Sequence, residues 1–119
     1  QACAAVVTLR QSITSLDLSG LELKNVDRLT KLTNLTSLKF RECKSLQNVD
    51  GLTHCTKLTS LELSKCESLQ TVDGLTHCTN LTSLDLGECL NVQPKPSPVH
   101  MTTREQVVAY QERIKKAMK

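Results

Sequence analysis

The amino-acid sequence predicts an α/β solenoid, a fold in which short repeats stack along one axis. The first observation is an internal period: residues 45–67 and 68–90 are identical at 17 of 23 positions, and periods of this size mark stacked repeat architectures. Each copy also carries L-x-x-L-x-L, in which alternate side chains of an extended segment point to opposite faces. Aromatic residues are nearly absent, with Phe40 and Tyr110 the only two, so leucine must fill the core.

Short parallel strands are expected where each copy contains L-x-L. The clear copies begin at Ile13, Leu35, Leu58 and Leu81. The expected strands lie near residues 15–18, 37–40, 60–63 and 83–86. In the third copy the alternation turns Leu61 and Leu63 inward and Glu62 outward. The strands should therefore stack about 4.8 Å apart as one parallel sheet.

The return path of each copy is expected to be a short 3₁₀ or α turn. It contains an aspartate in three copies, at Asp27, Asp50 and Asp73. Aspartate is a favoured cap for a helical turn, because its carboxylate accepts hydrogen bonds from free backbone N–H groups. Residues 1–12 precede the first clear copy, and Val6 and Leu9 could belong to a degenerate first turn or to an irregular cover.

The chain changes character after the fourth copy. We assign residues 1–92 to the repeat domain, residues 93–101 to a proline-rich connector and residues 102–119 to an amphipathic helix. The helix should begin with a capping box, either T-x-x-E from Thr102 or T-x-x-Q from Thr103. Its apolar stripe recurs at helical spacing and consists of Val107, Tyr110, Ile114 and Ala117 or Met118.

This stripe has two interpretations. An open stack exposes apolar edges at its ends and needs polar caps, so the helix is expected to cover the last repeat. In the alternative, the helix docks on a partner through Val107, Tyr110, Ile114 and Met118.

The repeated pattern L-x-x-L-x-L-x-x-C, followed by L-x-x-V-x-x-L, resembles the leucine-rich repeat family over residues 13–92. The family's usual asparagine at the ninth position is replaced by Cys43, Cys66 and Cys89, and by Leu21 in the first copy. The cysteine-marked spacing is also similar to repeats of trypanosomatid leucine-rich proteins. The resemblance implies a parallel sheet on a concave face, 3₁₀ or α turns on a convex face, and a non-enzymatic role in protein–protein interaction.

Five of the six cysteines follow the repeat and are expected to be buried fillers. Cys43, Cys66 and Cys89 share one phase, while Cys55 and Cys78 share another in which the first copy has Leu32. A position that accepts leucine is an apolar position, and free cysteine behaves as a small hydrophobe. Disulfide or metal binding stays open as the lesser alternative, although the spacings fit no zinc template. Unpaired thiols in this number favour a reducing compartment, and hence the cytoplasm.

The sequence predicts neither a catalytic nor a cofactor site. It contains no phosphate-binding glycine loop, H-E-x-x-H or G-x-S-x-G motif. The pairs His54-Cys55 and His77-Cys78 would stack as neighbours, but adjacent side chains on a turn diverge, so these histidines are expected on the surface. No stretch is apolar enough to enter a membrane. The basic end of the tail lacks interleaved aromatics and does not predict a nucleic-acid partner.

The outward strand positions form the candidate binding face. We expect it to comprise Asp17, Ser19, Lys39, Arg41, Glu62, Ser64 and Asp85. Its central charge varies from copy to copy, as a selective surface would require, and Arg41 is a residue type enriched at interface hot spots. The alternative is a solvated surface in which Lys39 is stabilised between Asp17 and Glu62 as cross-strand neighbours.

The functional hypothesis is a cytoplasmic interaction scaffold that binds a protein partner on its concave face. As the alternative, the chain is a regulatory or localisation segment of a larger protein, whose helix docks on a partner or leads into another domain. Weak self-association through the ends of the stack is a further expectation.

Overall fold

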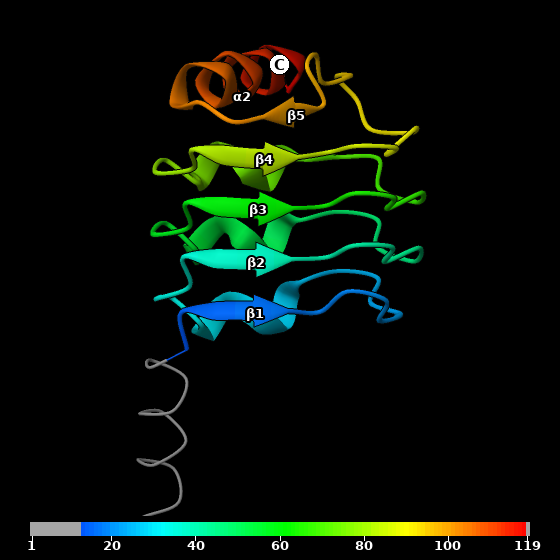
Figure 1. The fold of residues 1–119 in the computed structure, drawn as a ribbon, viewed down its shortest axis with the longest axis vertical. Helices are drawn as coiled ribbons and strands as arrows, with labels where there is room; N and C mark the ends of the chain where they lie inside the picture. Colours follow the sequence, from blue (N-terminus) through cyan, green and yellow to red (C-terminus); the bar gives the residue numbers. More distant parts are fainter. Residues whose placement is uncertain (1–12, 119) are drawn as a thin grey trace, which may run out of the picture.

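The computed structural model describes residues 13–118, so the expectations for Val6 and Leu9 lie outside the described residues. Within this range, four short strands form a parallel sheet and a fifth joins it antiparallel (Figure 1). They are β1 (Ser15–Asp17), β2 (Ser37–Lys39), β3 (Ser60–Glu62), β4 (Ser83–Asp85) and β5 (His100–Met101). Their order in the sheet follows their order in the chain. The parallel sheet expected from the repeated L-x-L segments is therefore present.

The parallel strands pair in register, so equivalent residues of successive copies stand side by side. The inward row consists of Leu16, Leu38, Leu61 and Leu84. The outward row consists of Asp17, Lys39, Glu62 and Asp85. Because successive strand residues alternate between the two faces, one row packs into the core while the other stays accessible.

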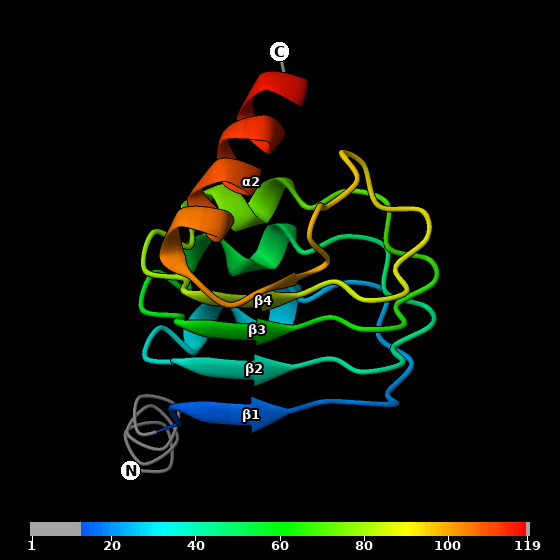
Figure 2. The same ribbon diagram turned by 45° about the horizontal axis from the view of Figure 1, so that its top comes forward.

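The return paths are 3₁₀ helices, which lie behind the sheet (Figure 2). They are η1 (Asp27–Lys31), η2 (Asp50–His54) and η3 (Asp73–His77). The expectation that their aspartates cap them is wrong: valine occupies each N-cap position, and no side chain makes a cap hydrogen bond there. Instead, the Oδ1 atoms of Asn25 and Asn48 accept the N–H groups of Asp27 and Asp50 at 3.1 and 3.2 Å. Asparagine is suited to such a local turn contact.

One continuous apolar cluster fills the space between the sheet and the 3₁₀ helices. Its columns repeat the sequence period, and their members are at most 1% exposed. They include Leu35, Leu58 and Leu81; Phe40, Leu63 and Leu86; Leu46, Leu69 and Val92; Val49 and Val72; and Leu52 and Leu75. Each column continues from copy to copy because equivalent side chains stack on one another.

Two glycines allow neighbouring 3₁₀ helices to approach closely. A Cβ atom at Gly51 would overlap the carbonyl oxygen of Val26, and one at Gly74 would overlap that of Val49. Arg28 occupies the equivalent position in the first copy. Glycine is therefore found where one 3₁₀ helix stacks on the helix before it, as η2 stacks on η1 and η3 on η2.

A second recurring backbone feature follows each strand. Gly20, Glu42, Lys65 and Glu88 occupy equivalent positions with φ between 58° and 79°. This left-handed region favours glycine, yet only the first copy uses it there. In the other three copies, charged residues occupy this left-handed position in the turns that border the outer face.

The tail covers the last repeat with β5 and with helix α2 (Arg104–Ala117). The N-cap of α2 is Thr103, whose side chain accepts the Gln106 N–H while the Gln106 side chain accepts the backbone N–H of Thr103. The second of the two expected capping boxes is therefore the one formed. Val107, Tyr110 and Ile114 are at most 2% exposed, and α2 lies at the end of the stack (Figure 1).

Polar contacts hold α2 against that end. The buried Gln111 donates from Nε2 to the carbonyl oxygens of Leu75 and Cys78 at 2.8 and 2.9 Å. Arg104 donates to the Leu81 carbonyl at 2.6 Å. The Leu75 and Cys78 oxygens also accept the N–H groups of Cys78 and Leu81, so the bonds from Gln111 chiefly satisfy its own buried amide, which would cost free energy without a partner.

Candidate functional site

The outer face of the sheet carries an open groove of about 640 Å³. Its lining residues are Ser19, Gly20, Arg41, Glu42, Glu62, Ser64, Lys65, Asp85 and His100. Five of the seven residues predicted for the binding face line it, namely Ser19, Arg41, Glu62, Ser64 and Asp85. The other two, Asp17 and Lys39, share the outward row with Glu62 and Asp85 but do not line the groove. The register of the sheet thus brings together residues far apart in the sequence.

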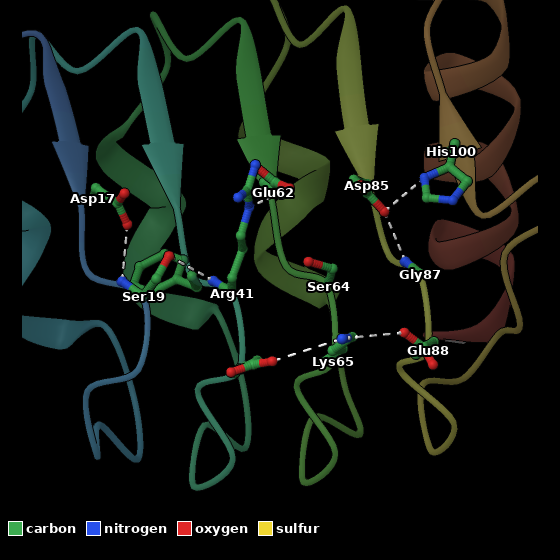
Figure 3. Close-up of polar contacts among 12 residues, drawn as sticks. Asp17, Ser19, Arg41, Glu62, Ser64, Lys65, Asp85, Gly87, Glu88 and His100 are labelled. Atoms are coloured by element: carbon green, nitrogen blue, oxygen red, sulfur yellow. Dashed lines mark hydrogen bonds and ion pairs between the residues drawn. The ribbon is translucent and has the colours of Figure 1, made fainter.

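An ion pair between Arg41, two residues after β2, and Glu62 on β3 lies in the groove (Figure 3). The Nε of Arg41 donates to Oε1 of Glu62 at 2.7 Å, and this hydrogen bond raises the pKa of Arg41. The expected pairing of Lys39 with Glu62 is not the one formed, although the two residues are register neighbours. Arg41 forms this contact in preference to Lys39 because its planar, multi-donor group suits carboxylate geometry.

Two aspartates of the outward row form the same local turn. Oδ1 of Asp17 accepts the Ser19 N–H at 3.0 Å, and Oδ1 of Asp85 accepts the Gly87 N–H at 2.8 Å. Hydrogen bonds from the side chain and backbone of Ser19 lower the pKa of Asp17. The Ser19 hydroxyl also accepts the Arg41 N–H at 3.0 Å, as Figure 3 shows. The polar groups at the strand ends are thus oriented by the backbone.

Four lining residues were missed by the sequence reasoning, namely Gly20, Glu42, Lys65 and His100. Nδ1 of His100 lies 2.9 Å from Oδ1 of Asp85, so the tail completes one end of the groove. Nζ of Lys65 lies 3.7 Å from Glu42 and 3.9 Å from Glu88. The repeat alignment could have indicated Lys65 and Glu42, since they occupy equivalent positions beside the expected face. His100 lies outside the repeats, so no equivalent residue in another copy could have indicated it.

The threonines next to this face have a structural role. The hydroxyl groups of Thr36, Thr59 and Thr82 each donate to the carbonyl oxygen of the equivalent threonine in the preceding copy, at 3.0–3.2 Å. The hydroxyl row thereby adds a second ladder beside the sheet. Recurrence of threonine here follows from stacking and does not by itself indicate a ligand.

The cysteines at the ninth repeat position bond to the preceding copy. The Sγ atoms of Cys43, Cys66 and Cys89 lie 3.2, 2.9 and 2.7 Å from the carbonyl oxygens of Leu18, Phe40 and Leu63. These three cysteines, with Cys55 and Cys78, are buried free thiols, while Cys3 lies outside the described residues. Cysteine thus serves as the donor at the ninth repeat position, and the predicted burial of the described cysteines is confirmed.

Alkaline pH is expected to destabilise the fold through two of these thiols, Cys55 and Cys78. Burial raises the pKa of Cys55, and that of Cys78 from 9.0 to about 12. A raised pKa means that the unfolded chain releases its proton first, so this stability is present below about pH 9 and disappears as pH rises toward 12. Over this range each such thiol lowers the free energy of unfolding by up to about 1.4 kcal/mol per pH unit. Urea unfolding between about pH 8 and pH 11 measures the loss.

Cys78→Ala provides the comparison for this pH dependence. It removes one titrating thiol, so the stability of the variant should fall less steeply with pH than that of the unchanged chain, whatever its stability at neutral pH. A urea midpoint that is independent of pH over the same range would contradict the burial of the thiols.

The alternative binding surface on α2 is largely covered. Val107, Tyr110 and Ile114 pack against the last repeat, and the Tyr110 hydroxyl donates to the Pro94 carbonyl at 2.6 Å. Met118, at the end of the stripe, is 53% exposed. The helix stripe therefore presents one side chain of the four to solvent.

Comparison with known proteins places the repeats in a family. Residues 54–74 and 77–89 match the family model described as Leucine Rich repeat. No curated protein matches the chain. Within the described residues, no helix has both the length and the apolar character that a membrane crossing requires. The matched copies carry the same L-x-x-L-x-L and cysteine positions that build the sheet and its core, so the comparison supports leucine-rich repeats in this part of the chain.

Proposed function

We propose that this chain is a non-enzymatic interaction module, a leucine-rich repeat solenoid that binds a protein partner on the outer face of its sheet. Leucine-rich repeats generally mediate protein–protein interaction. The observation that carries the proposal is the groove, because the register gathers Ser19, Arg41, Glu62, Ser64 and Asp85 on one accessible surface. The division into a repeat domain, a connector and a C-terminal cap belongs to the same proposal.

The polar groups of the groove suit recognition better than catalysis. Asp85 and His100 form a pair that a hydrolytic triad would also need. However, the side chains of His100 and Asp85 are 66% and 28% exposed, whereas the aspartate of such a triad is buried. By contrast, Arg41 is held by Glu62 and is still 56% exposed. An ordered, exposed arginine loses little side-chain entropy when a partner binds it.

The surroundings of the groove support this choice of surface. Burial of Val107, Tyr110 and Ile114 favours the sheet over the helix stripe as the binding surface. The buried free thiols of the described residues favour a reducing location such as the cytoplasm. Self-association through the ends of the stack stays a prediction, and at the C-terminal end α2 would have to move first.

Arg41→Glu is expected to abolish partner capture. The change reverses a charge at the centre of the groove and places two carboxylates together, so affinity should fall at least about tenfold. Stability should change little, because exposed ion pairs contribute up to about 1 kcal/mol. Co-purification from extracts, followed by mass spectrometry, compares the proteins retained by each variant.

Lys116→Glu serves as the matched control. It makes the same charge change at an exposed position of α2, away from the groove. Proteins retained by the unchanged chain and by Lys116→Glu, but lost from Arg41→Glu, would identify partners of the groove. Equal retention by all three chains would contradict the proposed function.

A further inference from the structure

Two neighbouring carboxylates occupy the outer face where β3 meets β4. Glu62 and Asp85 are directly opposite each other in the register, and their side chains are 20% and 28% exposed. Like charges in directly opposite positions destabilise a sheet. A cation placed between the two carboxylates would therefore be favoured by both.

The chain supplies only part of the positive charge that this pair needs. Arg41, two residues after β2, contacts Glu62 through Nε. Asp85 is contacted by the imidazole of His100 and by the Gly87 N–H, both at Oδ1. A guanidinium offers a planar, multi-donor group that matches carboxylate geometry, which an imidazole does not. Asp85 therefore has room for a stronger hydrogen-bonding partner.

The charges of the whole face change sign across the strands. β1 presents Asp17 and β2 presents Lys39, with Arg41 two residues further along the chain. β3 and β4 present Glu62 and Asp85. The side chain of Glu88, which follows β4, is 70% exposed and lies 3.9 Å from Nζ of Lys65. The end of the groove nearest the tail is thus its more acidic end.

We propose that this end recognises a basic side chain, arginine or lysine, in an extended segment of the partner protein. The inference rests on the proposed function, since it assumes that the sheet face is the surface that binds. Charge complementarity selects the occupant: a guanidinium or ammonium group over β3 and β4 would contact both Glu62 and Asp85 and relieve their repulsion. His100 then forms the wall of this position and gives up its contact with Asp85 to the incoming group.

A pair of synthetic peptides tests this directly. One is a short glycine-rich peptide with a single arginine, and the other carries citrulline, which keeps the shape and removes the charge. In titrations followed by amide NMR, the arginine peptide should bind with millimolar affinity, as one charged contact allows. The largest shifts should occur at Gly87, whose N–H is bonded to Asp85, and on β3. The citrulline peptide should bind at least about tenfold more weakly.

Asp85→Asn is the informative variant, because its side-chain oxygen can still accept the Gly87 N–H and keep the turn. This variant should bind the arginine peptide at least about tenfold more weakly than the unchanged chain does. Glu105→Gln, on the exposed surface of α2, removes the same charge and should leave binding unchanged. No shift at Gly87 with millimolar arginine peptide, or equal shifts with citrulline or with Asp85→Asn, would overturn the inference.

Failure here is distinguishable from failure of the proposed function. If Arg41→Glu abolishes partner capture while the peptides give none of the expected shifts, the groove binds a partner of other chemistry. If neither Arg41→Glu nor Asp85→Asn affects capture and the peptides show no selective shift, both proposals are wrong.

Discussion

A chain that ends at Val92 is expected to lose most of its stability. Removal of the tail takes away Met101, Val107, Tyr110 and Ile114, all at most 2% exposed, and uncovers the apolar edge of the last repeat. Burial of each such side chain contributes about 1.5–3 kcal/mol, although the freed tail regains conformational entropy. We expect a net loss of at least about 3 kcal/mol, equivalent to a fall in Tm of roughly 12–24 °C.

Point variants separate capping from a general effect of truncation. Ile114→Ala should cost about 2–5 kcal/mol, because it leaves a cavity between α2 and the last repeat. Val108→Ala lies on the same helix at 36% exposure and should change stability by less than about 1 kcal/mol. Calorimetric melting of the two variants and the shortened chain measures the three effects. An unshifted Tm for the shortened chain would show that the tail is not a cap.

Gly74→Ala is expected to be the most damaging single-methyl addition in the repeats. Its Cβ would overlap the carbonyl group of Val49 in the preceding copy. Backbone atoms on both sides belong to stacked 3₁₀ helices, so relief of the overlap must separate η2 from η3 and open the core between them. Overpacking usually costs about 1–3 kcal/mol, and this rigid contact should reach the upper end of that range.

Arg28→Ala is the matched control for this prediction. The equivalent position of η1 already carries a Cβ atom, so alanine introduces no new backbone overlap. The loss of stability should therefore be clearly smaller than that caused by Gly74→Ala. Urea denaturation compares the two variants, and an equally small effect of Gly74→Ala would mean that the helices are less closely stacked than described.

The fold could be predicted where the sequence repeats. A 23-residue shift superimposes Leu61 on Leu84 and Glu62 on Asp85, and the sheet pairs these same residues. Alternation within L-x-L then separated core residues from the outward row without further information. For the same reason most of the predicted binding residues do line one groove, although their role in binding is still a proposal.

Contacts between particular side chains were harder to predict. Lys39, Arg41 and Glu62 were all expected on one face, but the choice of ion pair depends on side-chain length and donor geometry. The aspartates that begin the 3₁₀ helices were expected as caps, because residue type alone favours that role. The backbone places their N–H groups against the preceding asparagines in two copies.

What the sequence determined by itself is the repeat: its period, its inward leucine and cysteine columns and the residues that share the outer face. These follow from the chain alone because each residue's neighbour lies one period away. Only the tertiary structure decided how the tail closes the stack, with β5 on β4, His100 beside Asp85 and Gln111 on the carbonyl groups of η3. The tail has no repeated partner, so its contacts depend on the shape and the backbone carbonyl groups of an end that forms only when the copies assemble.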